Sequence, residues 1–227
     1  MELIPRGKPG GGDIAGQEYM SETNYFSLLQ VSAVQEMTNI GLGSAATALS
    51  QLTGHSFNME VPKVQAVPVE DIPFLIDMGD QPVVGLYTPI YGDVDGHIAF
   101  LFPWDSAVYL WNCIIGTAPA DMSEIDEMAA SVMMEVGNII NSSFLNAIAD
   151  MTGSTIHICP PCVSIDISMS ITSSIAVQAE AMESTALAVE TKIFASDDHS
   201  ISGCFLCIPS AHGLNLLFER LGIGEAA

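Results

Sequence analysis

Basic residues are scarce in this chain of 227 residues, which has five lysines and arginines against 27 aspartates and glutamates. None of the five lies between Gln65 and Thr191. A protein that binds nucleic acid needs a basic stripe to displace counterions from phosphates, and an anionic membrane surface also attracts basic segments. The sequence therefore argues against a nucleic-acid-binding protein and against one that docks on anionic lipid.

Long apolar runs and a secretion signal are also missing. The best candidate for a membrane span, residues 99–116, is interrupted by Pro103, Asp105 and Asn112, whereas a span needs about 18 apolar residues. The N-terminus lacks the apolar core of a signal peptide. We therefore expect a cytoplasmic protein without membrane insertion, whose five cysteines are reduced.

The chain does have ample apolar content, 49%, for a conventional core. Residues 1–24 are rich in glycine and aperiodic, which predicts a flexible leader. Residues 25–222 are expected to form one domain of two repeat units, at about 25–116 and 123–222. Each unit is too small to bury a sheet alone, so we expect them to share one core.

The repeat is carried by polar residues. From Leu29 to Pro62, nine of 34 positions are identical to those 99 residues later, where unrelated sequences would give roughly two. The apolar positions drift, which indicates that polar chemistry, rather than packing alone, fixed the identical positions. Four of the identical pairs form one sparse pattern: Ser32/Ser131, Glu36/Glu135, Asn39/Asn138 and Pro62/Pro161.

Periodicity and turn residues predict the order α-β-β-β-α in the first unit and a similar order in the second, with about seven extra residues in its strand region. The first unit has expected helices at Tyr25–Leu52 and Asp105–Ile115, and expected strands at Phe57–Val61, Val83–Tyr87 and His97–Phe102. The second has expected helices at Ser123–Met151 and from Pro209 to Leu221, and expected strands at Thr155–Cys159, Ser174–Ala181, Thr185–Phe194 and Ser202–Ile208.

The long helix of each unit is expected to expose one glutamate and one asparagine. At about 100° per residue, the Ser, Glu and Asn of the pattern fall opposite the apolar arc, with Glu and Asn at i and i+3. The residue one turn after Asn is small, Gly43 or Ser142, which leaves room for another surface. A single such helix is most often merely a solvated face. Two copies in register favour a functional surface.

An exposed carboxamide cannot act as a base, but it can orient a water molecule by donating and accepting hydrogen bonds. Attack on a phosphoryl group depends mainly on positioning and charge stabilisation. The chain has no cation at equivalent places, because Lys63 follows Pro62 whereas Cys162 follows Pro161. A phosphatase built on this pattern would have to take its metal and its lysine from the substrate.

The pattern Asp/Ser-x3-Glu-x2-Asn-x22-Pro, present twice, resembles the CheC/CheX/FliY family of chemotaxis phosphatases, over about Tyr25 to Gly222. The resemblance implies an α/β (α+β) fold with pseudo-twofold symmetry, antiparallel strands and both motif helices exposed on one side. Since the chain ends soon after the second unit, we expect it to lack the further C-terminal domain of flagellar-switch members.

The resemblance also implies a function: hydrolysis of the aspartyl phosphate of the receiver CheY. Asn39 and Asn138 would then align the attacking water, and Glu36 and Glu135 would engage the receiver's lysine. The serines and prolines of the pattern would support partner binding. No cofactor of its own is expected, since the phosphorylated receiver would supply Mg²⁺. The receptor deamidase CheD is a possible second partner.

Other interpretations stay open. The chain could be a non-catalytic adaptor for CheD or for the flagellar switch, or a module that binds the phosphorylated receiver without hydrolysing it. Cys159, Cys162, Cys204 and Cys207 have the spacing of a zinc site, although residues three apart on a strand point to opposite faces. The glycines at 41 and 43 mimic a dinucleotide loop but fall in an expected helix.

Overall fold

The computed structural model describes residues 27–75, 81–180, 185–195 and 200–223. The leader predicted at residues 1–24 lies outside these ranges. Among the described residues, no helix is both long enough and apolar enough to cross a bilayer.

The first repeat has the predicted helices and strands, with β1 extending seven residues beyond the expected end at Val61. Two short helical segments that were not predicted follow β1 directly. The elements are α1 (Leu28–Thr53), β1 (Phe57–Pro68), the 3-10 helix η1 (Val69–Asp71), α2 (Ile72–Leu75), β2 (Pro82–Gly92), β3 (Gly96–Pro103) and α3 (Trp104–Ile115).

The second repeat follows the first in outline, but the expected strand at Ser174–Ala181 is wrong, because residues 174–180 belong to a helix. The strand equivalent to β1 is also divided in two. The elements are η2 (Met122–Glu124), α4 (Glu127–Thr152), β4 (Ile156–Ile158), β5 (Cys162–Ile167), α5 (Ser168–Glu180), β6 (Thr185–Ala195), β7 (Ser200–Pro209) and α6 (Ala211–Arg220).

Tertiary burial explains the helix α5. Its residues Ile171, Ile175, Ala176 and Ala179 are buried and recur at helical spacing, so that one face packs on the sheet. The β-branched residues of this segment favour a strand locally, but here Ile171 and Ile175 lie on the buried face of a helix. α5 has 13 residues where the first repeat has the three of η1 and the four of α2, so most of the insertion expected among the strands lies in a helix.

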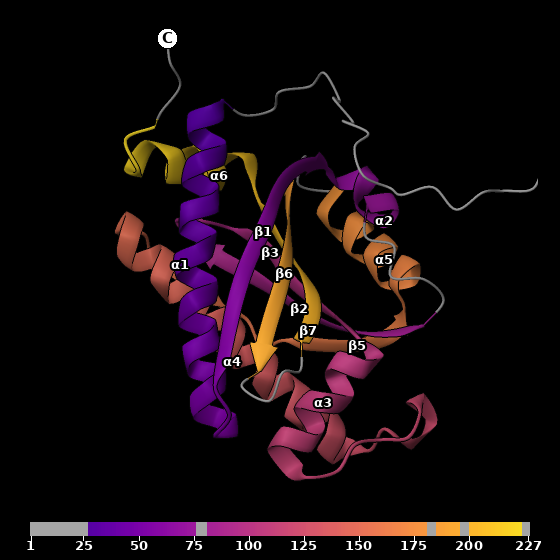
Figure 1. Cartoon of the computed structure of the whole chain (residues 1–227). Coiled ribbons are helices and arrows are strands. Elements are labelled where there is room, and N and C mark those ends of the chain that lie inside the picture. The colour runs from indigo at the N-terminus through magenta and orange to yellow at the C-terminus, as the bar shows by residue number, and fades with distance from the viewer. Residues whose placement is uncertain (1–26, 76–80, 181–184, 196–199, 224–227) are drawn as a thin grey trace, which may run out of the picture.

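The described strands form one antiparallel sheet in the order β1-β6-β7-β3-β2-β4, with β5 also paired to β2. Strands β3 and β7 pair at the centre, one from each repeat. Outside them, β1 of the first repeat pairs with β6 of the second, while β4 and β5 pair with β2 of the first. The two repeats thus exchange their first strands within a single sheet (Figure 1).

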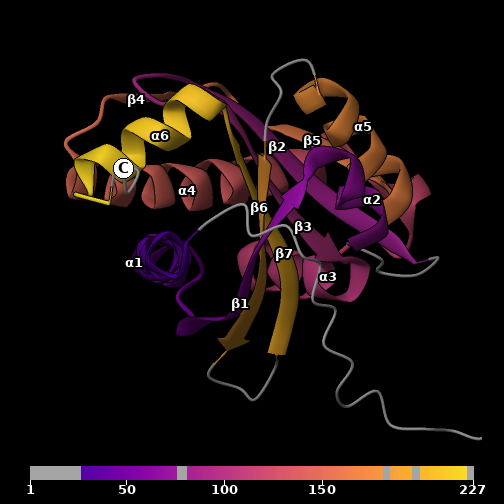
Figure 2. The same ribbon diagram turned by 90° about the horizontal axis from the view of Figure 1, so that it is seen from above.

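Helices cover both faces of this sheet. Along β3, Phe100 and Phe102 belong to the apolar cluster under α1 and α4, whereas Ala99 and Leu101 belong to the cluster under α2 and α5. Figure 2 shows α1 and α4 on one side of the strands and α2 and α5 on the other. The prediction that both motif helices lie on one side is confirmed, and the second helical layer is a feature that the sequence did not indicate.

Candidate functional site

The first candidate site lies on α1. Its start is fixed by a capping box, in which the Ser27 side chain accepts a hydrogen bond from the Gln30 backbone N–H and the Gln30 side chain accepts one from the Ser27 N–H. One face of the helix is buried, and Ser32, Glu36 and Asn39 lie on the exposed face. The exposure predicted for this copy of the pattern is confirmed. The buried face comprises Val34, Met37, Thr38, Gly41, Leu42, Ala45, Ala46 and Leu49.

The second candidate site lies on α4, where Asp126 caps the helix by accepting a hydrogen bond from the Ala129 backbone N–H at 2.8 Å. Ser131, Glu135 and Asn138 are exposed, as predicted. The opposite face of α4 supplies a large part of the main core, including Met133, Val136, Ile140, Phe144 and Ile148. In both repeats, therefore, the core fixes the rotation of the helix, and this rotation turns the polar pattern outward.

The two helices pack directly on each other. A Cβ atom on Gly41 of α1 would overlap the ring of Phe144 on α4, so this glycine permits the close approach. The contact lies less than one turn from Asn39. Because α1 and α4 are adjacent on the same layer, both candidate sites are open to a macromolecule that docks on this side (Figures 1 and 2).

The Glu and Asn side chains of both sites are free to bind a partner. Glu36, Asn39, Glu135 and Asn138 make no side-chain hydrogen bond or ion pair with any part of the chain that the structure describes. Beside Asn39, a Cβ atom on Gly43 would meet nothing within 4 Å. Beside Asn138, the hydroxyl of Ser142 donates to the Asn138 carbonyl oxygen at 2.6 Å and so stays close to the helix. The residue one turn after each amide therefore leaves room for another surface beside it, as the sequence predicted.

The two prolines of the pattern lie at irregularities of equivalent strands. In β1 the pairing with β6 shifts between Glu60 and Lys63, and Pro62 lies within this bulge. Pro161 lies in the gap between β4 and β5. Proline has no backbone N–H to donate to a ladder, which accounts for a break at both places. The structure places neither residue in the exposed stripes of α1 and α4.

α1 and α4 contain no lysine or arginine, and no group of three His, Cys, Asp or Glu residues that could hold a metal is found in the described ranges. An exposed carboxylate and amide can, however, enter a pocket of another protein that supplies the cation. The chemistry that fits this arrangement is completion of a partner's active site.

The other motifs do not form a second site. Cys162 lies on β5, while Cys204 and Cys207 lie on β7, and strands β2 and β3 separate them. The segment from Gly41 to Ala46 lies inside α1 and not at the junction of a strand and a helix that a dinucleotide loop requires.

One polar pair near the second site was missed. Asn141, one turn after Asn138, is fully buried, and its side-chain amide donates to Thr88 Oγ1 of β2 at 2.7 Å. The equivalent residue of the first repeat is Leu42, also fully buried. The only sign of this pair in the sequence is that Asn141 falls on the apolar arc of a predicted helix.

Comparison with known proteins gives consistent results. A model of the CheC-like family matches residues 29–65 and 128–165, one match in each repeat. CheY-P phosphatase CheC of Bacillus subtilis (strain 168) is 28% identical over 206 residues, 89% of this chain and 99% of that protein. CheC1 of Halobacterium salinarum is 30% identical over 132 residues, 58% of this chain and 67% of that protein.

Among solved structures, Thermotoga maritima FliY superimposes with a TM-score of 0.73 at 19% identity, covering 88% of this chain and 99% of that one. At this identity the likeness concerns the fold.

Proposed function

The chain belongs to the CheC-like family, and we propose that it is a phosphatase that hydrolyses the aspartyl phosphate of a CheY-type receiver protein. The relative from Bacillus subtilis that is named for this activity aligns over almost its whole length. The single observation that carries the proposal is the duplicated pair of exposed, unengaged side chains, Glu36 with Asn39 and Glu135 with Asn138.

In the proposed mechanism, Asn39 or Asn138 enters the receiver's phosphorylation site. The side-chain carbonyl accepts a hydrogen bond from a water molecule and holds it in line with the phosphorus atom. The water oxygen forms a bond to phosphorus while the bond from phosphorus to the aspartate oxygen breaks. The aspartate leaves as a carboxylate, and inorganic phosphate takes the oxygen and both protons of the water, as dihydrogen phosphate that equilibrates with solvent.

Glu36 and Glu135 are proposed to pair with a lysine of the receiver, which orients the amide relative to the phosphate. The carboxylate lies three residues before the amide on the same helix face, so one partner surface can contact both. The divalent cation that neutralises the phosphoryl oxygens is proposed to be Mg²⁺ held by the receiver's own carboxylates. This assignment is consistent with the lack of basic residues on α1 and α4.

The test follows the decay of the receiver's aspartyl phosphate with wild type, Asn39→Ala, Asn138→Ala and the double variant. Loss of a water-positioning amide should lower the rate at that site by about 10²–10³. The double variant should then give the receiver's intrinsic decay rate. Each single variant should retain only the rate that the unchanged site contributes. Asn146→Ala, an exposed asparagine further along α4, is the matched control and should leave the rate unchanged.

Two outcomes would contradict the proposal. If the double variant still accelerates decay, the amides do not orient the water. If the wild type binds the phosphorylated receiver without shortening the life of its phosphate, the chain is a binding protein or an adaptor.

A further inference from the structure

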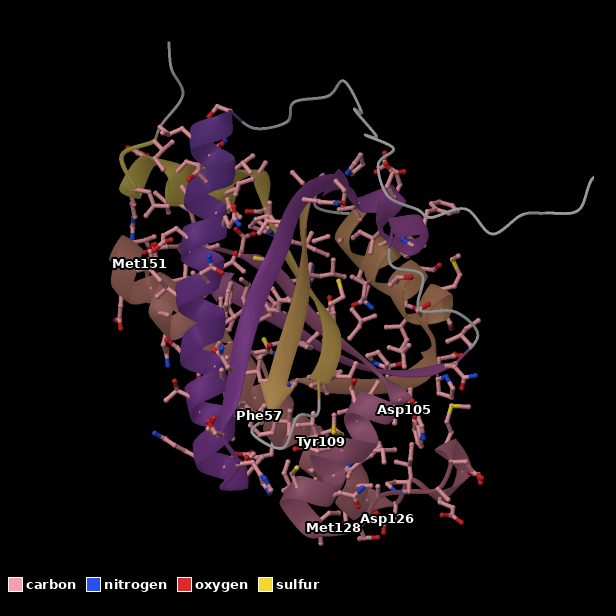
Figure 3. All side chains as sticks on the ribbon, in the orientation of Figure 1. Phe57, Asp105, Tyr109, Asp126, Met128 and Met151 are labelled. Atoms are coloured by element: carbon pink, nitrogen blue, oxygen red, sulfur yellow. The ribbon has the colours of Figure 1, made fainter. Side chains whose placement is uncertain are left out.

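Each motif helix has a strongly exposed large apolar side chain in its first turn. Leu29 of α1 is 64% exposed and Met128 of α4 is 62% exposed. They are separated by 99 residues, so they occupy the same position in the two repeats. In Figure 3, Met128 lies beside the capping residue Asp126, at the end of α4 opposite to Met151.

These side chains extend the exposed polar stripes. Leu29 precedes Ser32 by three residues and Glu36 by seven, which places it two turns from the glutamate on the same face. The spacing of Met128, Ser131 and Glu135 is identical. Each stripe therefore contains an apolar residue, a serine, a glutamate, an asparagine and a small residue, over about 21 Å of helix.

A single exposed leucine on a protein surface needs no explanation. Two large apolar residues at equivalent and strongly exposed positions do, because nothing in the core of the described chain requires them there. First turns of helices favour acidic residues for electrostatic reasons, and an apolar side chain gains nothing from that site in the free protein. The duplication points to a contact that forms only when the helix binds a partner.

We propose that Leu29 and Met128 are apolar anchors, which insert into the receiver beside its phosphorylation site and hold the Glu–Asn pair in register. This inference rests on the proposed function and extends it from the reacting groups to the docking surface. The partner surface that fits these anchors is an apolar depression. A cationic side chain should lie about 10 Å from it, the length of two helical turns.

The charge of this face favours such a partner over a second copy of the chain. α1 and α4 carry no basic residue, while Glu36 lies on one stripe and Glu135 on the other. Two such faces would repel each other, whereas a receiver that presents a lysine is complementary. The length of each stripe also suits a standard interface, which buries about 800 Å² on each partner.

The experiment uses full-length Leu29→Gln, Met128→Gln and the double variant. Glutamine keeps a similar length and a good helix propensity while it removes the apolar contact. Binding is measured with a receiver that carries beryllofluoride as the phosphoryl mimic, and the phosphate decay rate is measured as a function of phosphorylated receiver.

The chain offers a matched control pair. Leu52 and Met151 are the same two residue types, again 99 residues apart, and are 37% and 36% exposed on α1 and α4. They lie at the C-terminal ends of the helices and on a different face from the stripes. Leu52→Gln together with Met151→Gln should leave both binding and turnover unchanged.

The anchors should act on affinity and not on the chemical step. We expect the double anchor variant to raise the Kd and the KM by about tenfold, with the saturating decay rate within about twofold of wild type. The Asn variants should show the reverse, a lost saturating rate with retained affinity. Circular dichroism and thermal melting establish that each variant is folded.

A crossed design assigns each anchor to its own site. In the Asn138→Ala background, Leu29→Gln should raise the KM and Met128→Gln should not, and in the Asn39→Ala background the roles reverse. An unchanged Kd and KM in the double anchor variant would overturn the inference while leaving the phosphatase proposal intact. Failure of wild type to accelerate decay would contradict the proposed function. The Kd for the receiver would then be the only test of whether Leu29 and Met128 contribute to binding.

Self-association would also overturn the inference. In that case wild type would sediment as a concentration-dependent dimer without any receiver, and the anchor variants would sediment as monomers.

Discussion

Asn141 of α4 donates a hydrogen bond from its side-chain amide to Thr88 Oγ1 of β2, at 2.7 Å and with both residues fully buried. The side-chain carbonyl oxygen of Asn141 has no hydrogen-bond partner in the described chain. The pair ties α4 to the sheet one turn from the candidate residue Asn138. A buried polar pair of this kind is costly to break from one side only, because the remaining group keeps its desolvation penalty.

A double-mutant cycle tests this linkage. Asn141→Ala and Thr88→Val should each lower the free energy of unfolding by about 1–3 kcal/mol, because each leaves a buried polar group without a partner. The double variant should cost about 1–2 kcal/mol less than the sum of the two single changes. Urea unfolding followed by circular dichroism measures the four proteins. Strictly additive effects would show that the two side chains are not coupled.

Two glycines of α1 should respond in opposite ways to alanine. A Cβ atom at Gly41 overlaps the buried ring of Phe144, so Gly41→Ala should lower the free energy of unfolding by about 1–3 kcal/mol through overpacking. Gly43 faces open space, and Gly43→Ala should raise it by about 0.5–1 kcal/mol through helix propensity. Thermal melting of the Gly41→Ala and Gly43→Ala variants measures the two changes in stability. Equal shifts in the same direction would contradict the packing of α1 on α4.

The sequence predicted the exposed stripes because a long helix with one apolar arc has a single stable rotation on a sheet. Once Val34, Leu49 and Ile148 are buried, Glu36 and Glu135 must point outward. The exposure follows from periodicity alone, whereas the chemical roles of these residues stay predictions. The repeat likewise predicted the shared topology, since the same pattern of elements occurs twice.

The helical layer of α2 and α5 could not be predicted in this way. The residues of α5 include Ile171, Thr172, Ile175 and Val177, whose β-branched side chains favour strands locally. Only the exposed second face of the sheet, which must be covered, makes a helix the better solution. That requirement is a long-range property of the fold, because the sheet forms only when strands of both repeats pair.

The stability of the fold should depend on pH through His97 of β3. Burial lowers the pKa of His97, against a smaller opposing effect of the Asp95 carboxylate. The unfolded chain therefore binds this proton at a higher pH than the folded chain does. Stability is present above the unfolded pKa of about 6.5 and is lost as the pH falls from there toward the lowered folded value.

We expect the free energy of unfolding to fall between pH 7.5 and pH 5, and to fall less in His97→Gln. Glutamine can both donate a hydrogen bond to and accept one from the Tyr87 hydroxyl, which lies 2.6 Å from His97 Nδ1. His212→Gln, at an exposed histidine of α6, serves as the control. Urea unfolding across this pH range is the measurement, and equal pH slopes in wild type and His97→Gln would contradict the assignment.

The glutamates of the two sites should make receiver binding sensitive to salt. Glu36 and Glu135 are exposed and lie on helices without basic residues, so their charge is available to a lysine of the receiver. An exposed ion pair contributes about 0.2–1 kcal/mol, and salt screens it over about 10 Å at 0.1 M. Glu36→Gln with Glu135→Gln should therefore weaken binding of the beryllofluoride-loaded receiver several-fold at low salt.

The affinity of wild type should fall toward that of the double variant as sodium chloride rises toward 0.5 M. Salt screens the ion pairs of the wild type, and the variant does not have these pairs. Asp71→Asn, at an exposed acid of η1 beside the α2 and α5 layer, is the control for removing a negative charge away from the stripes. Titration calorimetry at several salt concentrations measures both proteins. If Asp71→Asn weakens binding as much as the paired glutamate change does, the effect belongs to the overall charge of the chain and not to the stripes on α1 and α4.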